Sequence, residues 1–372
     1  MKIVLAPDSF KESMSAAEAI SAMRDGVLAA LPDTECVGVP MADGGEGTVD
    51  AVVDALDGEI VTVEVADALG RAIPARYGYV PGRRLAVIEM AAAAGLELIA
   101  PDERDVLRAS TFGVGQLIAH ALDRGAGEFL VGLGGSATND AGVGMLTALG
   151  ASLTDAAGAP LPPGGAALAD LHRIDLSGLD PRLAHVRIQL ACDVTAPLLG
   201  PGGASAVFGP QKGATPDDVA RLEAALTRFA AVADAAHTDT PGAGAAGGLG
   251  FALLEFLGAT SRPGVEVVAE TVGLEQALRG AQWVFTGEGG VDAQTLLGKT
   301  PFGVARVAAR TGTRVVIFAG RVADDASVLL DHGVDEIVGI TAPGTPLAEA
   351  LRTGPQSLAR AAADFLRRHY GC

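Results

Sequence analysis

Residues 58–90 read GEIVTVEVADALGRAIPARYGYVPGRRLAVIEM. Three strand-like runs follow one another here, separated by turn residues, with no room for a helix between them. This spacing predicts an antiparallel meander. On both sides of it, short β-branched runs alternate with helical patterns, which predicts parallel sheets that are buried on both faces. The meander therefore marks the crossover of the chain from one α/β domain into another.

The alternation on the two sides of the meander predicts an α/β fold with two domains. We expect residues 1–60 and 265–372 to form a discontinuous parallel-sheet α/β/α domain of the Rossmann or flavodoxin type. Residues 61–264 then form an inserted α/β domain. Because ligands usually bind in clefts between domains, the active site is expected in the cleft that such an insertion creates.

The other predicted strands are short and mostly apolar: KIVLA (2–6), ECVGVPM (35–41), EFLVGL (128–133), RIQLACDV (187–194), WVFTG (283–287), RVVIFAG (314–320) and EIVGI (336–340). A capping box at Ser15 and Glu18 predicts a helix that begins there, and a second helix is expected near Thr48.

The composition excludes several classes of protein. A formal charge of −18 disfavours nucleic acid and anionic membranes as partners. No apolar stretch reaches the roughly 20 residues needed to span a bilayer. The first residues are typical of a strand and not of a signal peptide. Three cysteines give neither a disulfide framework nor metal-ligand spacing, so a reducing cytoplasm is expected. Nothing in the sequence distinguishes a monomer from a homodimer.

The segment FTGEGGVDAQTLLGKTPFG (285–303) ends in Gly298-Lys299-Thr300, the last letters of a nucleotide phosphate loop. The complete signature needs a glycine five positions before Gly298, where this chain has Ala293. The segment is therefore not a Walker loop, although Lys299 still lies beside the acids Glu288 and Asp292.

Glycine-rich loops with polar or acidic residues follow several of the predicted strands, where open α/β sheets form their sites. MADGGEGTVDA contains Asp43 and Glu46 before a helix, which indicates either an anion site or a tight turn with a capping acid. GLGGSATNDAGVG (132–144) matches the dinucleotide fingerprint, but Asp140 at the expected helix start would repel a pyrophosphate. Gly134, Gly135 and Ser136 could instead bind phosphate, with Asp140 toward Mg²⁺; a purely structural turn is the alternative.

Two further loops lie between residues 187 and 256. The first, after RIQLACDV, places Asp193 at a strand end and Lys212 in a Gly/Pro-rich stretch. An Asp there can orient or deprotonate a hydroxyl group, and Lys212 can neutralise an anion; a capping Asp and a solvated Lys are the alternative. The second, GAGAAGGLGFALLEF (242–256), is either another anion site or a hinge before a helix.

Lysines are scarce in this chain. Of the four, Lys11, Lys212 and Lys299 lie in loops rich in glycine, proline or acids, and Lys11 belongs to PDSFK (7–11) with Asp8 and Ser9. Because arginine supplies the surface charge elsewhere, this placement indicates an anionic ligand.

Six segments in one order resemble the bacterial glycerate kinase family: APDSFKESMSA, MADGGEGTVDA, GLGGSATNDAGVGM, ACDVTAPLLGPGGASAVFGPQKGA, AAGGLGFAL and FTGEGGVDAQTLLGKTP. They extend from residue 6 to residue 301. The resemblance implies transfer of the γ-phosphoryl group of ATP, with Mg²⁺, to D-glycerate, and it favours 2-phosphoglycerate as the product.

The resemblance also implies site residues. The catalytic group is Asp193, Lys299 and Lys212; the substrate group is Asp8, Ser9, Lys11, Arg71 and Glu288; the ATP group is Gly134, Gly135, Ser136 and Asn139; the Mg²⁺ group is Asp43, Glu46, Asp140 and Asp292. Arg71, in ADALGRAIPA, would bind the substrate carboxylate. Ala196 departs from the family pattern, which usually has Asn before this proline.

Phosphoryl transfer requires alignment of a hydroxyl group and neutralisation of charge, with little covalent help from the protein. Asp193 is therefore predicted to orient or deprotonate the hydroxyl group, and Lys299 or Lys212 to stabilise the transferring group. The alternatives are an NAD(P)-dependent dehydrogenase of a small hydroxy acid that uses the 132–137 fingerprint, a kinase for another hydroxy acid or polyol, and a non-catalytic binding protein for a small anion.

Overall fold

The computed structural model describes residues 1–371, and the chain forms two compact units. Unit 1 contains Met1–Asp43, Asp50–Asp57 and the chain from Pro263 onward; unit 2 contains Gly44–Val49 and Gly58–Arg262. The predicted boundaries lie within three residues of the two points, near residues 58 and 263, where the chain passes from one unit to the other. The short segment 44–49, predicted as part of the first domain, instead belongs to unit 2. The division of the chain into two domains stays a prediction.

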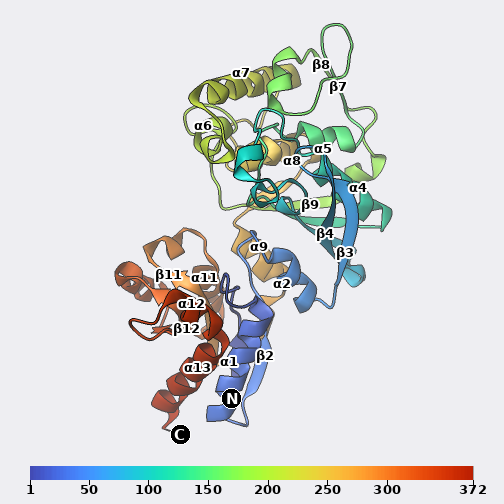
Figure 1. The fold of residues 1–372 in the computed structure, drawn as a ribbon. Coiled ribbons are helices and arrows are strands. Elements are labelled where there is room, and N and C mark those ends of the chain that lie inside the picture. Colours follow the sequence, from blue (N-terminus) through green and yellow to red (C-terminus); the bar gives the residue numbers. More distant parts are fainter. Residues whose placement is uncertain (372) are drawn as a thin grey trace. The chain divides into compact units, whose positions relative to one another are not determined.

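Unit 1 is built on a five-stranded sheet in the order β13-β12-β11-β1-β2, with every neighbouring pair parallel. Its strands are β1 (Lys2–Leu5), β2 (Glu35–Gly38), β11 (Trp283–Val291), β12 (Arg314–Val322) and β13 (Glu336–Gly339). Val4 at the centre is in register with Val37 and Val284. The prediction of a parallel sheet formed from both chain ends is confirmed (Figure 1).

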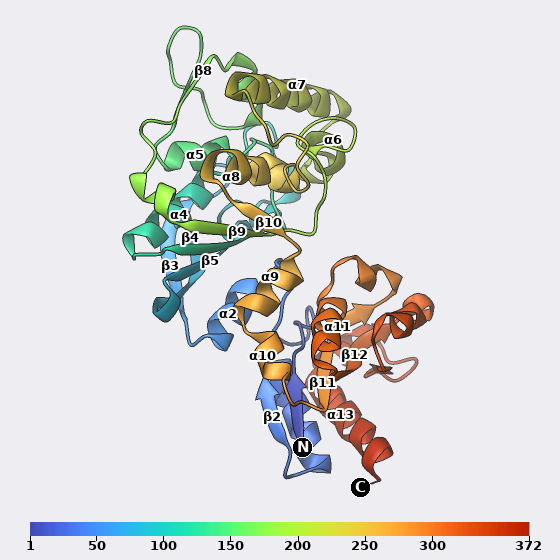
Figure 2. The same ribbon diagram turned by 180° about the vertical axis from the view of Figure 1, so that it is seen from behind.

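Helices cover both faces of this sheet because β1 alternates its side chains between two apolar cores. Ile3 and Leu5 belong to one core, which α1 and α13 complete, and these two helices lie side by side in Figures 1 and 2. Val4 and Ala6 belong to the other core, which α9, α10 and α11 complete. The helices of this unit are α1 (Ala16–Ala30), α9 (Gly264–Thr271), α10 (Leu274–Leu278), α11 (Thr300–Thr311), α12 (Leu347–Arg352) and α13 (Gly354–Tyr370), with 3₁₀ turns at Ala293–Leu297 and Asp324–His332.

The predicted capping box is present at the start of α1. The Ser15 side chain accepts from the Glu18 N–H, and the Glu18 carboxylate accepts from the Ser15 N–H at 2.8 Å. The second helix predicted near the N-terminus, α2 (Thr48–Ala55), begins at Thr48 as expected. Both predictions are confirmed, and for α1 the reason is that a capping box depends on residues only three positions apart.

Unit 2 contains a six-stranded mixed sheet in the order β10-β9-β6-β5-β4-β3. The predicted meander is confirmed: β3 pairs antiparallel with β4, and β4 with β5. From β5 onward the pairs β5–β6, β6–β9 and β9–β10 are parallel. The strands are β3 (Glu59–Ala66), β4 (Ala72–Val80), β5 (Leu85–Glu89), β6 (Glu128–Gly132), β9 (Arg187–Ala191) and β10 (Thr260–Arg262), and β7 (Ser152–Thr154) and β8 (Arg173–Asp175) form a separate hairpin.

The apolar core of unit 2 joins one face of its sheet to the helices around it (Figure 1). Ile88, Val131 and Leu190 from three adjacent strands are fully buried in it. The helices are α3 (Ala91–Ala94), α4 (Phe112–Asp123), α5 (Val143–Ala148), α6 (Ala204–Phe208), α7 (Pro216–Ala233) and α8 (Leu249–Leu257). The 3₁₀ turns are Pro81–Arg83, Leu96–Leu98, Pro101–Glu103, Gly165–Asp170, Pro181–His185, Pro210–Lys212 and Ala245–Gly248.

One predicted helix start is wrong. We expected a helix to begin within the polar run that starts at Ser136, but α5 begins only at Val143. Ala141 and Gly142 have φ values of 53° and 75°, so the chain cannot continue as a right-handed helix across them. The stretch from Leu133 to Gly142 is therefore a long loop.

Among the helices of residues 1–371, none is long and apolar enough to cross a membrane.

Candidate active site

Unit 1 gathers acidic side chains at the carboxyl edge of its sheet. Asp8 follows β1, and Glu288 lies in the neighbouring strand β11. The Asp8 N–H donates to the Gly287 carbonyl at 2.9 Å, which fixes the turn after β1 against β11. The order of the strands reverses between β1 and β11, and open α/β sheets bind ligands beside such a point. These carboxylates therefore lie where a site is expected.

Asp8 is buried, with 9% of its surface exposed. Its carboxylate accepts from the Ser9 N–H at 2.6 Å and from the Thr300 hydroxyl group at the start of α11. Burial raises the pKa of Asp8 to about 6, and the hydrogen bond from Thr300 opposes that rise. The carboxyl group therefore changes its charge close to physiological pH.

Glu288 is paired with Lys299, as the proximity of both to one loop suggested. The Lys299 Nζ lies 3.3 Å from Glu288 Oε1, 3.3 Å from the Gly290 carbonyl and 3.9 Å from Asp292 Oδ1. Burial raises the pKa of Glu288 to about 7 in spite of the lysine. Asp292 Oδ1 is buried and has no hydrogen-bond partner among the described residues.

Asp43 belongs electrostatically to the same group. Its charge contributes to the raised pKa of both Asp8 and Glu288. Ser9 is half-buried and Lys11 is exposed in the turn that follows, close to Gly289 of β11. The structure therefore places seven of the predicted site residues at one edge of unit 1: Asp8, Ser9, Lys11, Asp43, Glu288, Asp292 and Lys299.

In unit 2, the glycine-rich loop after β6 is fixed by its neighbours in the same unit. A Cβ at Gly132 would lie 2.4 Å from the Gly44 carbonyl oxygen, so only glycine permits this close approach. That contact explains why segment 44–49, with Glu46 exposed on it, belongs to unit 2. The Leu96 N–H donates to the Gly135 carbonyl at 2.8 Å and the Ala137 N–H to the Ala94 carbonyl at 2.9 Å.

Lys212 supports this loop from inside the protein. Its side chain is 2% exposed, and its Nζ donates to Ser136 Oγ at 2.8 Å and to the Thr138 carbonyl at 2.7 Å. Burial lowers the pKa of Lys212 to about 7, and the nearby charge of Asp140 opposes that fall. Lys212 is therefore not a solvated side chain. It holds the Thr138 carbonyl and the Ser136 hydroxyl group of the loop in place.

Asp140 is also an internal support of the loop. It is 1% exposed and accepts from the Thr111 N–H (2.8 Å), the Thr111 hydroxyl group (2.9 Å), the Gly142 N–H (3.1 Å) and the Gly144 N–H (3.1 Å). Burial raises its pKa and these hydrogen bonds lower it. With four protein donors, Asp140 is suited to hold the loop and α5 together, and it is poorly placed to coordinate a metal ion.

The remaining predicted residues of unit 2 lie at the same edge of its sheet. Asn139 is fully buried; its Nδ2 donates to Ser205 Oγ at 3.0 Å, whereas its Oδ1 has no hydrogen-bond partner among the described residues. Asp193 is exposed two residues after β9, and the last residue of β9, Ala191, is in register with Gly132. Gly134, Ser136 and Asp193 therefore follow neighbouring strand ends.

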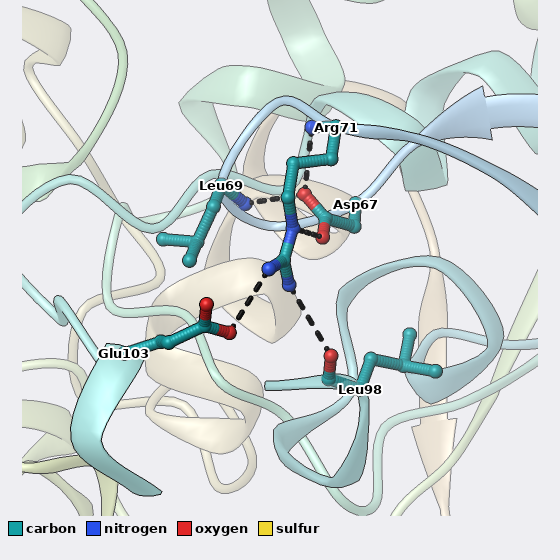
Figure 3. Close-up of polar contacts among 5 residues, drawn as sticks. All are labelled: Asp67, Leu69, Arg71, Leu98 and Glu103. Atoms are coloured by element: carbon teal, nitrogen blue, oxygen red, sulfur yellow. Dashed lines mark hydrogen bonds and ion pairs between the residues drawn. The ribbon is translucent and has the colours of Figure 1, made fainter. Parts of the chain in front are cut away.

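Arg71 lies in the hairpin loop between β3 and β4 and is already engaged with acids (Figure 3). Its Nε donates to Asp67 Oδ2 at 2.6 Å, its Nη1 to Glu103 Oε2 at 3.0 Å and its Nη2 to the Leu98 carbonyl at 3.3 Å. The arginine side chain is 44% exposed. β3 runs in the same direction as β5, so this loop lies at the same edge as the glycine-rich loop.

Four residues of this arrangement were not predicted: Thr300, which binds Asp8; Thr111, which binds Asp140; and Asp67 and Glu103, which bind Arg71. The sequence could have indicated two of them, because Thr300 lies next to Lys299 and Asp67 lies four residues before Arg71. It could not have indicated Thr111 and Glu103, since 29 and 32 residues separate them from their partners.

Carboxylates, lysines and a glycine-rich loop lie at the carboxyl edges of the two sheets of this α/β protein. Such groups suit a phosphotransferase, because phosphoryl transfer needs positioning and neutralisation of charge. A family model described as the glycerate kinase family matches residues 3–369. Glycerate kinase of Bacillus subtilis (strain 168) is 46% identical over 369 residues, 98% of this chain and 97% of the relative. Glycerate 2-kinase of Escherichia coli (strain K12) is also 46% identical, with the same shares.

A solved structure agrees with these relatives. The crystal structure of a Salmonella typhimurium LT2 protein assigned as glycerate kinase 2 matches with a TM-score of 0.92 and 46% identity, covering 100% of this chain and 98% of the other. The chain belongs to the glycerate kinase family.

The dehydrogenase alternative is not supported. Two relatives that each match 98% of this chain are named glycerate kinase and glycerate 2-kinase. The fingerprint at 132–137 does not open a helix, since α5 begins only at Val143. A dinucleotide site also needs an acid about 20 residues further on. Asp155 lies near that position, and its carboxylate accepts the N–H groups of Ala157 and Ala159 in the loop after β7.

Proposed function

We propose that this chain transfers the γ-phosphoryl group of ATP to the 2-hydroxyl group of D-glycerate and releases 2-phosphoglycerate and ADP. One observation carries the proposal: within unit 2, a glycine-rich loop and the loop that bears Arg71 lie at the same edge of one sheet. Such an edge can hold a phosphate chain and a substrate carboxylate. The names of the relatives support the choice of glycerate and of its 2-hydroxyl group.

For the ATP phosphates, we assign the loop that contains Gly134, Gly135, Ser136 and Asn139. Glycine allows close approach of backbone to phosphate, and Gly135 has a φ of 73°, which a larger side chain would strain. Lys212 keeps Ser136 and Thr138 in position. Lys299, whose side chain is 34% exposed, is the better candidate to stabilise the transferring phosphoryl group by its charge.

For D-glycerate, Arg71 is assigned to the carboxylate and Asp193 to the hydroxyl group that reacts. Asp193 is exposed at the end of β9, and a carboxylate within hydrogen-bond reach can orient a hydroxyl group and accept its proton. Asp8, Ser9, Lys11 and Glu288 stay substrate-binding candidates. Because the pKa of Glu288 is about 7, a protonated fraction can donate a hydrogen bond to a substrate oxygen at neutral pH.

Mg²⁺ is assigned to Asp43, Glu46 and Asp292, with Asp140 withdrawn because its oxygens already accept protein donors. No cluster of three or more acidic, His or Cys side chains suited to a metal exists among residues 1–371. Mg²⁺ does not require one, since it usually keeps several waters and takes one or two carboxylates with substrate phosphates. Asp292 Oδ1, which is buried, lies 3.9 Å from Lys299 Nζ and has no hydrogen-bond partner among the described residues, fits such a ligand. When bound, the ion would neutralise phosphate charge.

The first test is ADP release by the purified chain with ATP, Mg²⁺ and D-glycerate, with the product identified by ³¹P–¹H coupling in NMR spectra. Glycerate-dependent ADP and coupling to the C2 proton are expected. Coupling to the C3 protons would overturn the regiochemistry. Turnover with only another hydroxy acid or a polyol would overturn the substrate, and ligand-induced stabilisation without any turnover would favour the binding-protein alternative.

The role of Asp193 needs a separate test. Asp193→Asn should lower kcat by about 10²-fold or more, the contribution typical of general acid–base catalysis. An Asp193→Asn variant with the kcat of the wild type would remove Asp193 from the mechanism. A cytoplasmic location and a monomeric or homodimeric state stay predictions from the sequence.

A further inference from the structure

The two acids that bind Arg71 differ sharply in burial. Asp67 is 1% exposed, and its carboxylate accepts three hydrogen bonds: Leu69 N–H at 2.8 Å, Arg71 N–H at 2.8 Å and Arg71 Nε at 2.6 Å. The Asp67 N–H also donates to the Arg71 carbonyl at 2.7 Å. One buried side chain therefore closes the hairpin loop and fixes the Nε side of the guanidinium group.

The Nη side of the same group faces partners that can be exchanged. The Glu103 side chain is 53% exposed and makes one hydrogen bond to Arg71, at 3.0 Å from Nη1. Exposed ion pairs of this kind contribute little, because water solvates both charges well. Removing a buried carboxylate that accepts three hydrogen bonds, such as that of Asp67, costs far more. The two acids are drawn together in Figure 3.

Hydrogen bonds link Arg71 to the glycine-rich loop in the same unit. The Leu98 carbonyl, which accepts from Arg71 Nη2, ends a turn whose first residue, Leu96, donates to the Gly135 carbonyl. A carboxylate held on the Nη side would therefore lie close to the loop assigned to phosphate.

We propose that Asp67 is a positioning residue that fixes Arg71 for the substrate, and that the Glu103 carboxylate occupies the place of the substrate carboxylate until the substrate displaces it. This inference rests on the proposed function. In a chain with a charge of −18, an exposed arginine attracts acids of the same chain. An exchangeable partner such as Glu103 pairs with Arg71 and still leaves it available to a substrate. The exchange also predicts that the site selects hydroxy acids over neutral polyols, because a neutral group cannot replace the charge of Glu103 at the guanidinium group.

Steady-state kinetics of two variants test the exchange. Glu103→Gln removes the competing charge and should lower the KM for D-glycerate about two- to fivefold, with smaller changes in kcat and in the KM for ATP. Glu97→Gln is the matched control, since Glu97 is an exposed acid in the same segment and makes none of the described contacts of Arg71. A higher KM in Glu103→Gln would show that Glu103 is a permanent partner and would overturn the exchange.

Asp67→Asn tests the positioning role. The amide oxygen can keep the two N–H groups that Oδ1 accepts, but the amide NH₂ then faces Arg71 Nε, donor against donor. We expect the KM for D-glycerate to rise about tenfold or more with a smaller change in kcat. We also expect the preference for glycerate over its neutral amide to fall, as we expect for Arg71→Lys. An unchanged KM and preference in a folded Asp67→Asn variant would overturn the role.

Calorimetry separates this inference from the proposed function. D-glycerate and other small hydroxy acids are titrated into the wild type and the variants without ATP. If the wild type binds a hydroxy acid but does not phosphorylate glycerate, the function fails while tighter binding by Glu103→Gln and weaker binding by Asp67→Asn still support the inference. If glycerate is phosphorylated but neither variant changes its binding, the inference fails alone.

Discussion

The Nζ of Lys212 lies 2.8 Å from the Oγ of Ser136 in the interior of unit 2, although 76 residues separate them in the chain. A second hydrogen bond, to the Thr138 carbonyl, makes this lysine a support for two residues of the loop assigned to the ATP phosphates. The loop is therefore held from below by a charged group and not only by its own glycines. Its rigidity depends on a side chain that solvent hardly reaches.

Lys212→Met should impair ATP binding. The change leaves the Ser136 hydroxyl group and the Thr138 carbonyl without their donor, and unpaired buried polar groups cost about 1–3 kcal/mol each. We expect the KM for ATP to rise about tenfold, the equivalent of about 1.4 kcal/mol, with a smaller effect on the KM for D-glycerate. An unchanged KM for ATP would mean that the loop holds its shape without Lys212.

The same variant should remove a pH dependence of stability. The pKa of Lys212 falls from 10.5 to about 7 on folding, so between these values the unfolded chain binds more protons than the folded one. The stability of the wild type relative to Lys212→Met should therefore rise from pH 7 toward pH 10. Below pH 7 the free-energy cost of burying the charged lysine should be present in full. Urea unfolding of both proteins at pH 6, 7.5 and 9 measures this; a constant difference would contradict the buried lysine.

Glu288→Gln should change the pH dependence of stability in the opposite direction and at lower pH. Burial raises the pKa of Glu288 from 4.5 to about 7, so the folded state binds more protons within that interval and wild-type stability falls as pH rises through it. The glutamine variant does not lose stability in this way. Its stability relative to the wild type should therefore show no gain at pH 4, increase up to pH 7 and then stay constant. We expect a Tm about 2–4 °C above the wild type at pH 8 in thermal melts, with reduced activity. A variant less stable than the wild type at pH 8 would show that the pairing with Lys299 outweighs burial.

Thr300→Val should shift the acid limb of the pH–rate profile. The Thr300 hydroxyl group lowers the pKa of Asp8, so its loss should move that pKa above about 6 and the acid limb of kcat/KM to higher pH. Thr300→Ser keeps the hydroxyl group and should leave the limb in place. If both variants retained the wild-type profile, Asp8 would not be the group that titrates in the reaction.

Asp140→Asn should destabilise the protein without changing its need for Mg²⁺. An amide group would put a donor among the four donors that now converge on this carboxylate, at a cost of about 1–3 kcal/mol. We expect a lower Tm and the same Mg²⁺ concentration for half-maximal activity. A strongly raised Mg²⁺ requirement would return Asp140 to the metal ligands.

The sequence alone determined the features that depend on near neighbours in the chain. The capping box at Ser15, the meander at 58–90, the strands of both sheets other than β10 and the loops at their ends follow from periodicity and turn chemistry over a few residues. The short edge strand β10 was not predicted. The order of the motifs also identified the family. Even the helix predicted within the 132–144 loop failed for a local reason, the positive φ values at Ala141 and Gly142, which only the folded chain displays.

Tertiary structure decided what depends on segments far apart in sequence. It buried Lys212 beneath the glycine loop, surrounded Asp140 with donors, placed segment 44–49 in unit 2 and paired Arg71 with Glu103. The physical reason is that burial and hydrogen-bond partners, which set the charge and role of a side chain, are properties of the packed interior. A residue's type therefore indicated chemistry, and its neighbours in space decided whether it supports the loop or faces the ligand.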